Sequence, residues 1–175
     1  MQEVIEKARK IKCLISDVDG VLTNGLLYID NMGNELKAFN VQDGMGLKLL
    51  MSAGLHVAVI TTAQNQVVTE RMNQLGIQHV FTGQVDKRAA YSELKQRLNL
   101  ENDAFCYIGD DLPDLPIIQQ AGLGVAVANA VPQVKEFADW VTSFTGGSGA
   151  VRELCDLILN TQNLSNKALQ GYFAS

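Results

Sequence analysis

The chain has 175 residues, 47% of them hydrophobic, and a formal net charge of −5. This length and composition predict one globular domain with a sizeable core, and the absence of any block of Lys or Arg argues against binding to nucleic acid. The longest apolar runs, such as 57–60, are far too short to span a membrane. No cleavable apolar leader precedes the first motif, and three scattered cysteines are typical of buried thiols, so we expect a cytoplasmic protein.

The first predicted elements are a buried strand and a β-hairpin. Residues 11–16 form an apolar run that leads into Asp17-Val18-Asp19-Gly20. Two strand-like runs, 26–29 and 36–41, then flank a turn that is rich in Gly, Asn and Asp, which is the usual signal for a hairpin.

Helices and strands alternate along the rest of the chain. Asp43 is predicted to cap the first of these helices, which Gly54 ends. The predicted helices span 43–53, 65–75, 86–98, 115–121, 132–138 and 150–159. The predicted strands span 55–61, 78–82, 104–108, 124–128 and 140–143. Continuously apolar strands that alternate with helices predict an α/β fold with a doubly wound, Rossmann-like parallel sheet.

The predicted domain organisation is simple. Residues 1–160 are expected to form one domain, with the hairpin at about 24–41 as an insertion after the first strand and no cap domain. Residues 161–175 are mostly polar and are expected to form a C-terminal tail. In a doubly wound sheet the chemistry is found at the carboxyl ends of the strands.

Acidic residues follow two of the predicted strands. Asp17 and Asp19 end the first strand, and Asp110, Asp111 and Asp114 follow the strand 104–108. Taken alone, an Asp-x-Asp-Gly segment is more often a turn than a site. Several carboxylates that converge on one sheet edge repel one another, and carboxylate oxygens are the ligands that Mg²⁺ prefers. The two clusters together therefore predict a magnesium site.

Two further positions have the chemistry of phosphate binding. Thr61 and Thr62 end a strand, where a hydroxyl and backbone N–H groups can hold a phosphate oxygen. Lys87 opens a helix and would usually be a solvated surface lysine. A cation, a hydroxyl and a lysine together suit the equatorial oxygens of a phosphoryl group in transfer.

These motifs in this order resemble the haloacid dehalogenase superfamily of phosphohydrolases, through Asp17-Val18-Asp19-Gly20-Val21, Thr61, Lys87 and Gly109-Asp110-Asp111-x-x-Asp114. The finer resemblance is to a cap-less subfamily, the 3-deoxy-D-manno-octulosonate 8-phosphate (KDO 8-P) phosphatases. It is carried by the hairpin, Val41-Gln42-Asp43-Gly44, Gly83-Gln84-Val85-Asp86-Lys87 and the segment 146–153, and it covers about 11–159.

The resemblance implies a role for each site residue. Asp17 is implied as the nucleophile that forms an aspartyl-phosphate, and Asp19 as the general acid and base. The Mg²⁺ ligands are implied to be Asp17, the backbone carbonyl of Asp19, and Asp110. Asp114, with Asp111, is implied to orient these ligands.

The same resemblance implies that Thr61 and Lys87 bind the phosphoryl group. It also implies a small phosphorylated sugar acid as substrate, a step in lipopolysaccharide biosynthesis, and a homotetramer in which a neighbour covers each site. Arg152 is a candidate contact to the carboxylate of a substrate held by a neighbour.

Two positions depart from the subfamily pattern. Ala63 stands where an arginine is common after the Thr or Ser, and Gln42 stands where an arginine is common before Asp43-Gly44. The phosphatase chemistry is unaffected by these changes, but the choice of substrate is left open. A nine-carbon 2-keto sugar acid 9-phosphate is the nearest alternative.

Two other classes of protein remain open at this point. A phospho-receiver domain also combines acids, a Thr and a Lys on a doubly wound sheet, but its phosphorylated Asp ends a later strand. Here the runs 55–61 and 78–82 end in Thr, which argues against a receiver. A non-catalytic binding module is disfavoured because the full set of acids is present.

Overall fold

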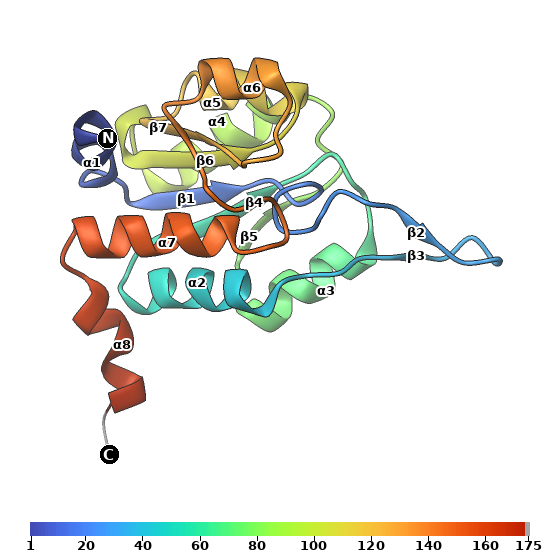
Figure 1. Ribbon diagram of the computed structural model, residues 1–175, viewed down its shortest axis with the longest axis horizontal. Coiled ribbons are helices and arrows are strands. Elements are labelled where there is room, and N and C mark those ends of the chain that lie inside the picture. Colours follow the sequence, from blue (N-terminus) through green and yellow to red (C-terminus); the bar gives the residue numbers. More distant parts are fainter. Residues whose placement is uncertain (174–175) are drawn as a thin grey trace.

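Six parallel strands form the central sheet of the computed structural model, which describes residues 1–173 (Figure 1). In spatial order they are β5 (His79–Phe81), β4 (His56–Ile60), β1 (Cys13–Ser16), β6 (Phe105–Gly109), β7 (Leu123–Ala126) and β8 (Trp140–Val141). Every neighbouring pair is parallel. The predicted doubly wound sheet is confirmed.

The middle of the sheet is apolar on both faces. All residues of β1 and β6 are buried, and so are the last four residues of β4. Strands of this kind need cover from helices on both sides. The register pairs Ser16 of β1 with Ile108 of β6, so these two strands end side by side.

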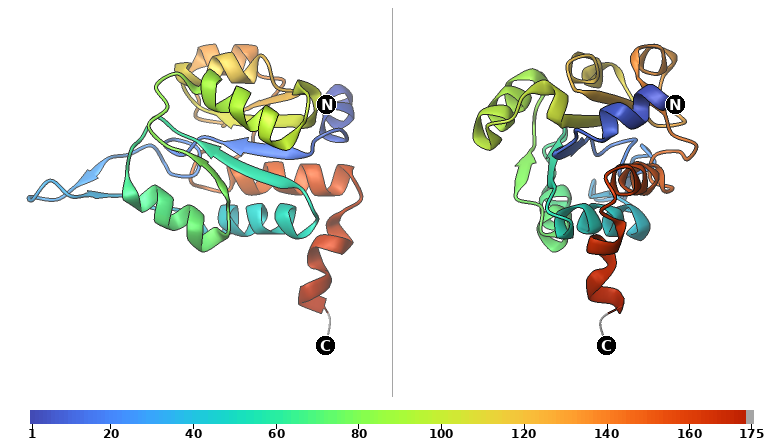
Figure 2. Two further views of the ribbon diagram at one scale, coloured as in Figure 1. Left: turned by 180° about the vertical axis from the view of Figure 1, so that it is seen from behind. Right: turned by 90° about the vertical axis from the view of Figure 1, so that its left-hand side faces the viewer.

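Two groups of helices cover the sheet (Figures 1 and 2). One face carries α2 (Val41–Ser52), α3 (Gln66–Leu75) and α7 (Ala150–Thr161), with α1 (Gln2–Ala8) beside α7. The other face carries α4 (Lys87–Leu98), α5 (Leu115–Ile118) and α6 (Pro132–Phe137). From β1 the chain winds toward β5, and from β6 it winds toward β8. The edge between β1 and β6 is therefore the switch point where such folds bind ligands.

The helices predicted over 65–75 and 86–98 are present as α3 and α4. Asn65 and Gly76 bound α3, and the Asp86 side chain accepts a hydrogen bond from Arg88 N at the start of α4. For α2 the predicted cap was wrong, because the helix begins two residues earlier and Asn40 accepts the hydrogen bond from Gln42 N. Asp43 instead lies buried in the first turn of α2.

The hairpin consists of β2 (Tyr28–Ile29) and β3 (Glu35–Leu36), which are antiparallel and stand away from the body of the molecule (Figures 1 and 2). The Asp30 side chain closes its turn by accepting hydrogen bonds from the backbone N–H groups of Met32 and Asn34. Large apolar side chains of the hairpin are more than 60% exposed: Leu26, Leu27, Ile29, Met32 and Leu36.

A last helix, α8 (Ser165–Phe173), was not predicted. It packs on α2, where Lys167 Nζ donates to Ala53 O at 2.7 Å and Ala168 is buried. Residues 174 and 175 of the predicted tail lie outside the described residues. The division into a domain over 1–160 and a tail over 161–175 stays a prediction. Within residues 1–173, no helix has the length and apolar character needed to cross a bilayer.

Candidate active site

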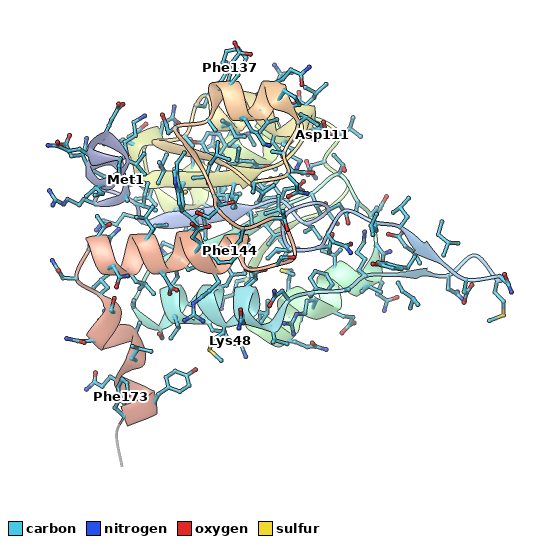
Figure 3. All side chains as sticks on the ribbon, viewed as in Figure 1. Met1, Lys48, Asp111, Phe137, Phe144 and Phe173 are labelled. Atoms are coloured by element: carbon cyan, nitrogen blue, oxygen red, sulfur yellow. The ribbon has the colours of Figure 1, made fainter. Side chains whose placement is uncertain are left out.

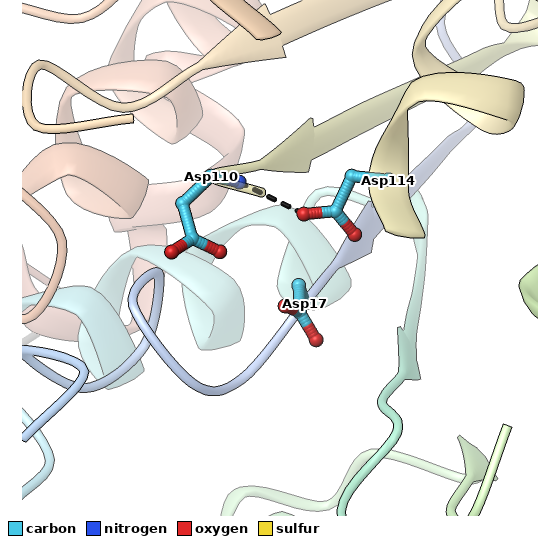
Figure 4. A group of neighbouring side chains, drawn as sticks. All are labelled: Asp17, Asp110 and Asp114. Carbon is cyan, nitrogen blue, oxygen red and sulfur yellow. Dashed lines mark hydrogen bonds between the residues drawn. The ribbon is translucent and has the colours of Figure 1, made fainter. Parts of the chain in front are cut away.

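Three carboxylates meet at the switch point of the sheet. Asp17 follows β1 directly, Asp110 follows β6, and Asp114 ends the short 3₁₀ helix Leu112–Asp114. One carboxylate oxygen from each lies within 4.8 Å of the other two (Figure 4). The strands impose this meeting, since Asp17 N donates to Ile108 O and so holds the end of β1 beside the end of β6.

Lys87 is the counter-charge of this cluster. Although it opens α4, its side chain is only 1% exposed, and Nζ lies 2.6 Å from Asp114 Oδ1 and 2.8 Å from Asp17 Oδ1. The approach to Asp17 is poorly aligned for a hydrogen bond, which leaves the buried Oδ1 of Asp17 without a hydrogen-bond partner among the described residues. The interpretation of Lys87 as a surface lysine is thereby excluded.

Asp114 is fully occupied by hydrogen bonds. Its Oδ1 accepts from Lys87 Nζ and from the Tyr107 hydroxyl, each at 2.6 Å. Its Oδ2 accepts from the backbone N–H groups of Asp110 and Asp111 at 2.8 and 3.2 Å. A carboxylate with four donors has little capacity left for a metal ion. Asp114 is therefore placed to orient the cluster.

Tyr107 was not predicted as part of the site; it lies inside β6 and is fully buried. A tyrosine in a strand that is otherwise apolar needs a buried partner for its hydroxyl. This need for a buried partner was the one sequence signal that could have pointed to Tyr107, but it does not identify the partner.

The cluster has an excess of negative charge. Burial is the main cause that raises the pKa of Asp17 to about 7 and that of Asp110 to about 8. The charge of Asp114 raises both pKa values further, while Lys87 opposes the shift. Carboxyl groups held this way favour a cation, which would relieve the repulsion. The carboxylates of Asp17 and Asp110 are donors that suit a hard divalent metal.

These acids line a pocket of about 230 Å³. Its walls also include Asp19, Gly25, Thr62 and Pro113. The predicted phosphate ligand Thr61 is completely buried at the end of β4, and its hydroxyl accepts a hydrogen bond from Ala63 N. Thr62, the neighbouring threonine considered in the sequence analysis, is the one that faces the pocket.

Asp19 lies at the mouth of the pocket, with 35% of its side chain exposed. Its Oδ1 accepts a hydrogen bond from Lys37 Nζ at 2.5 Å. Lys37, which follows the second strand of the hairpin, was not predicted as part of the site. Asp111 points to solvent at the same edge of the molecule (Figure 3), and its carboxylate caps the short helix through Leu112 N.

Arg152 is not part of this pocket. It lies in the first turn of α7, where Nε donates to the Asp156 carboxylate at 2.9 Å. Together with Gln42 and Phe144 it lines a separate hollow. The structure therefore does not bring Arg152 to the acids of its own chain, and its contact to a neighbour's substrate stays a prediction.

Two glycines allow the loops of the site to touch. A Cβ on Gly20 would lie 2.0 Å from Asp110 Oδ2, so only glycine lets Asp110 approach the loop that follows β1. A Cβ on Gly146 would lie 1.7 Å from Gly20 O. The loop before α7 is held there by a hydrogen bond from Gly147 N to Val21 O.

Comparison with known proteins gives the same result by sequence and by structure. Residues 58–154 match the family of haloacid dehalogenase-like hydrolases. The chain is 49% identical to the 3-deoxy-D-manno-octulosonate 8-phosphate phosphatase KdsC of Yersinia pestis over 161 residues, which covers 92% of this chain and 86% of the relative.

Two solved structures are similar over almost their whole length. One is a hydrolase of the same superfamily (subfamily III A) from Legionella pneumophila, with a TM-score of 0.97, 72% identity, and coverage of 98% of this chain and 94% of the other. The second is the 3-deoxy-D-manno-octulosonate 8-phosphate phosphatase of Moraxella catarrhalis in complex with magnesium, phosphate and KDO. Its TM-score is 0.94 at 42% identity, with coverage of 98% and 99%. The chain belongs to the haloacid dehalogenase-like hydrolase family.

Proposed function

We propose that this protein is a magnesium-dependent phosphatase that hydrolyses 3-deoxy-D-manno-octulosonate 8-phosphate to KDO and phosphate. The observation that carries the proposal is the arrangement around Asp17. Its carboxylate is buried at a strand end, 2.8 Å from Lys87 Nζ and beside Asp110, in a pocket open to a ligand. Two relatives with this substrate in their names align with 92% and 98% of this chain.

In the proposed reaction an oxygen of Asp17 attacks phosphorus, and the bond between phosphorus and the ester oxygen breaks. The bonding electrons leave with the sugar oxygen, which takes a proton from the Asp19 carboxyl group. Asp19 then removes a proton from a water molecule, whose oxygen bonds to phosphorus. The bond between phosphorus and the Asp17 oxygen breaks, its electrons return to the Asp17 carboxylate, and phosphate is released. The positive charge of Lys87 stabilises the negative phosphoryl oxygens, and Thr61 or Thr62 donates a hydrogen bond to them from a hydroxyl or backbone N–H group.

The residues present fit a bound Mg²⁺. Asp17 and Asp110, together with the backbone carbonyl of Asp19, are the proposed ligands, and Asp114 with Asp111 holds the backbone that carries Asp110. When bound, the ion neutralises charge on the phosphoryl oxygens. The raised pKa values of Asp17 and Asp110, caused mainly by burial, support this assignment.

A homotetramer is the proposed assembly, and the exposed hairpin supports it. Two short strands cannot bury their own side chains, and Leu27, Ile29 and Leu36 are accordingly each more than 60% exposed in the single chain. Association of hairpins would cover them and bring a neighbour to the open pocket. The proposed place in lipopolysaccharide biosynthesis and the cytoplasmic location follow from the proposed substrate.

The decisive experiment replaces the nucleophile. Asp17→Asn is expected to abolish Mg²⁺-dependent phosphate release and to leave the circular dichroism spectrum unchanged. The control is Asp103→Asn, an exposed and remote acid that should keep full activity. Substantial residual turnover by Asp17→Asn would contradict the assignment of the nucleophile.

A separate experiment tests the substrate. KDO 8-P is expected to be the best substrate in a panel of phosphorylated metabolites that includes the nine-carbon 2-keto sugar acid 9-phosphate. Gln42 and Ala63 stand where relatives commonly have arginine, so the nine-carbon acid is the competitor to watch. If neither sugar acid were among the best substrates, the proposed substrate class would be wrong and the chemistry would stand.

A further inference from the structure

Lys37 has surroundings that its position in the chain does not explain. It follows β3 on a hairpin that is otherwise open to solvent, yet only 3% of its side chain is exposed. Its Nζ lies 2.5 Å from Asp19 Oδ1 and 2.7 Å from Glu35 Oε1. A lysine on an exposed hairpin would ordinarily extend its charge into water. Here the charge is held inside, between two carboxylates.

The two carboxylates come from different parts of the structure. Glu35 is in the hairpin itself, two residues before Lys37, whereas Asp19 belongs to the loop that follows β1. Lys37 ties the hairpin to that loop through a charge-assisted hydrogen bond to Asp19, and it forms an ion pair with Glu35 inside the hairpin. The bond to Asp19 engages Oδ1, and no described residue donates a hydrogen bond to Oδ2.

We propose that Lys37 is a positioning residue that orients the Asp19 carboxyl group for proton transfer to the leaving oxygen. This inference rests on the proposed function, in which Asp19 is the general acid. With Oδ1 held by Lys37, the carboxyl group has one orientation and Oδ2 is left to meet the substrate. The proton moves from Oδ2 to the ester oxygen as its bond to phosphorus breaks, and Lys37 keeps all of its own protons.

The hairpin then has a second role besides association of subunits. The hairpin that exposes large apolar side chains also carries the ammonium group that binds Asp19. Any disturbance of the hairpin is therefore expected to reach the proton-transfer step, although no hairpin residue other than Lys37 bonds to Asp19 among those described.

The test compares esters with different leaving groups. An alkyl phosphate such as KDO 8-P needs a proton on its leaving oxygen, whereas p-nitrophenyl phosphate releases a stable phenolate without one. Lys37→Met keeps a stem of similar length and removes the charge. For this variant the first-turnover rate with the alkyl ester is expected to fall roughly 100-fold, as befits a general-acid contribution. The burst of p-nitrophenol should stay within a few-fold of the parent, and so should KM for both esters.

The controls separate positioning from loss of structure. Lys48→Met removes an exposed lysine from α2 and should change neither rate. Lys37→Cys should show the same defect, and treatment with bromoethylamine, which rebuilds an ammonium side chain on sulfur, should restore the alkyl ester rate. The native Cys13, Cys106 and Cys155 are all buried and should be spared. If the rates with both esters fall in parallel, or if aminoethylation restores nothing, the inference is wrong.

Asp19→Asn distinguishes this inference from the proposal beneath it. If that variant loses the alkyl ester rate selectively and Lys37→Met does not, only the role of Lys37 falls. If Asp19→Asn instead slows the reaction of both esters equally, Asp19 is not the general acid, and the role proposed for Lys37 is wrong as well.

Discussion

Asp114 explains how several acids can share one sheet edge. Its four hydrogen bonds come from a lysine, a tyrosine and two backbone N–H groups. Two of those donors belong to Asp110 and Asp111, so Asp114 fixes the backbone that carries Asp110. Oδ1 of Asp114 accepts the hydrogen bond from Lys87 and so holds the ammonium group beside Asp17. One fully bonded carboxylate therefore holds the residues around it in place.

Tyr107 is the donor whose loss is most informative. Tyr107→Phe keeps the ring and removes one hydrogen bond to a buried charge, and we expect it to lower the free energy of unfolding by roughly 1.5 to 3 kcal/mol. Because Lys87 shares the same oxygen, kcat should fall as well. Urea denaturation and phosphatase assays measure the two effects. Tyr91→Phe is the matched control, since the Tyr91 hydroxyl bonds to Asn102 far from the site and kcat should not change.

Binding of Mg²⁺ is expected to depend on pH. In the metal-free protein, burial above all raises the pKa of Asp17 to about 7 and that of Asp110 to about 8. The metal binds the deprotonated carboxylates, so protons compete with it below these pKa values. The affinity should therefore rise as the pH rises through about 7 to 8 and level off above.

Calorimetric titration of Mg²⁺ in buffers of different ionisation enthalpy checks this directly. Protons should be released on binding below the two pKa values and not well above them. An affinity that stays constant across this range would contradict the proposed ligands.

The individual site residues differ in how well the sequence predicts them. Asp17, Asp110 and Asp114 follow strands, and a parallel sheet brings adjacent strand ends together, so their meeting was predictable. Lys87 was predicted only in combination with the acids and Thr61, because a lysine at the start of a helix is usually solvated. Tyr107 and Lys37 lie next to apolar residues in strand-like runs, and their partners are distant in the chain. Only the three-dimensional structure identifies those partners.

At the scale of elements, Asp43 joins α2 to the start of α7. Asp43 in α2 accepts hydrogen bonds from Gly149 N and Arg152 N at the start of α7. It thus caps a helix more than a hundred residues away. A local pattern cannot show this, because Asp43 also follows the rule for capping its own helix.

Asp43→Ala is expected to destabilise the protein. Removing a side chain that caps a helix costs roughly 1 to 2 kcal/mol, and the loss should appear as a lower urea midpoint. Asp156→Ala provides the control, because its partly exposed pair with Arg152 on the same helix should contribute no more than about 0.5 kcal/mol. Equal losses from the two variants would refute the capping role.

The order of helices and strands was predictable because apolar runs and caps recur along the chain. The residues at which helices and strands begin and end were less predictable. The helix predicted over 115–121 ends at Ile118, and the strand predicted over 11–16 begins at Cys13. The helix α8 was missed because polar and apolar residues are mixed in its sequence and only Ala168 is buried. Its packing depends on α2, which local pattern does not reveal.

At the scale of the whole molecule, the hairpin is the surface to test. The double variant Leu27→Lys with Ile29→Lys places charges where the proposed tetramer buries apolar side chains. It is expected to be a folded monomer by light scattering, with reduced phosphatase activity because the pocket loses its cover. Phe137→Lys changes an equally apolar residue on α6 and should leave the mass unchanged (Figure 3). An unaltered mass for the double variant would exclude the hairpin as the interface.

The contact between Gly146 and Gly20 has a consequence for how the protein is made. The ribosome releases the amino-terminal part of a chain first, and distant contacts form late. Asp17 and Asp19 therefore leave the ribosome long before the loop that packs against Gly20 exists. A nascent chain contains these acids before the segment with Gly146 and Gly147, which contacts their loop, has been synthesised. The complete site therefore assembles only when most of the chain has been made.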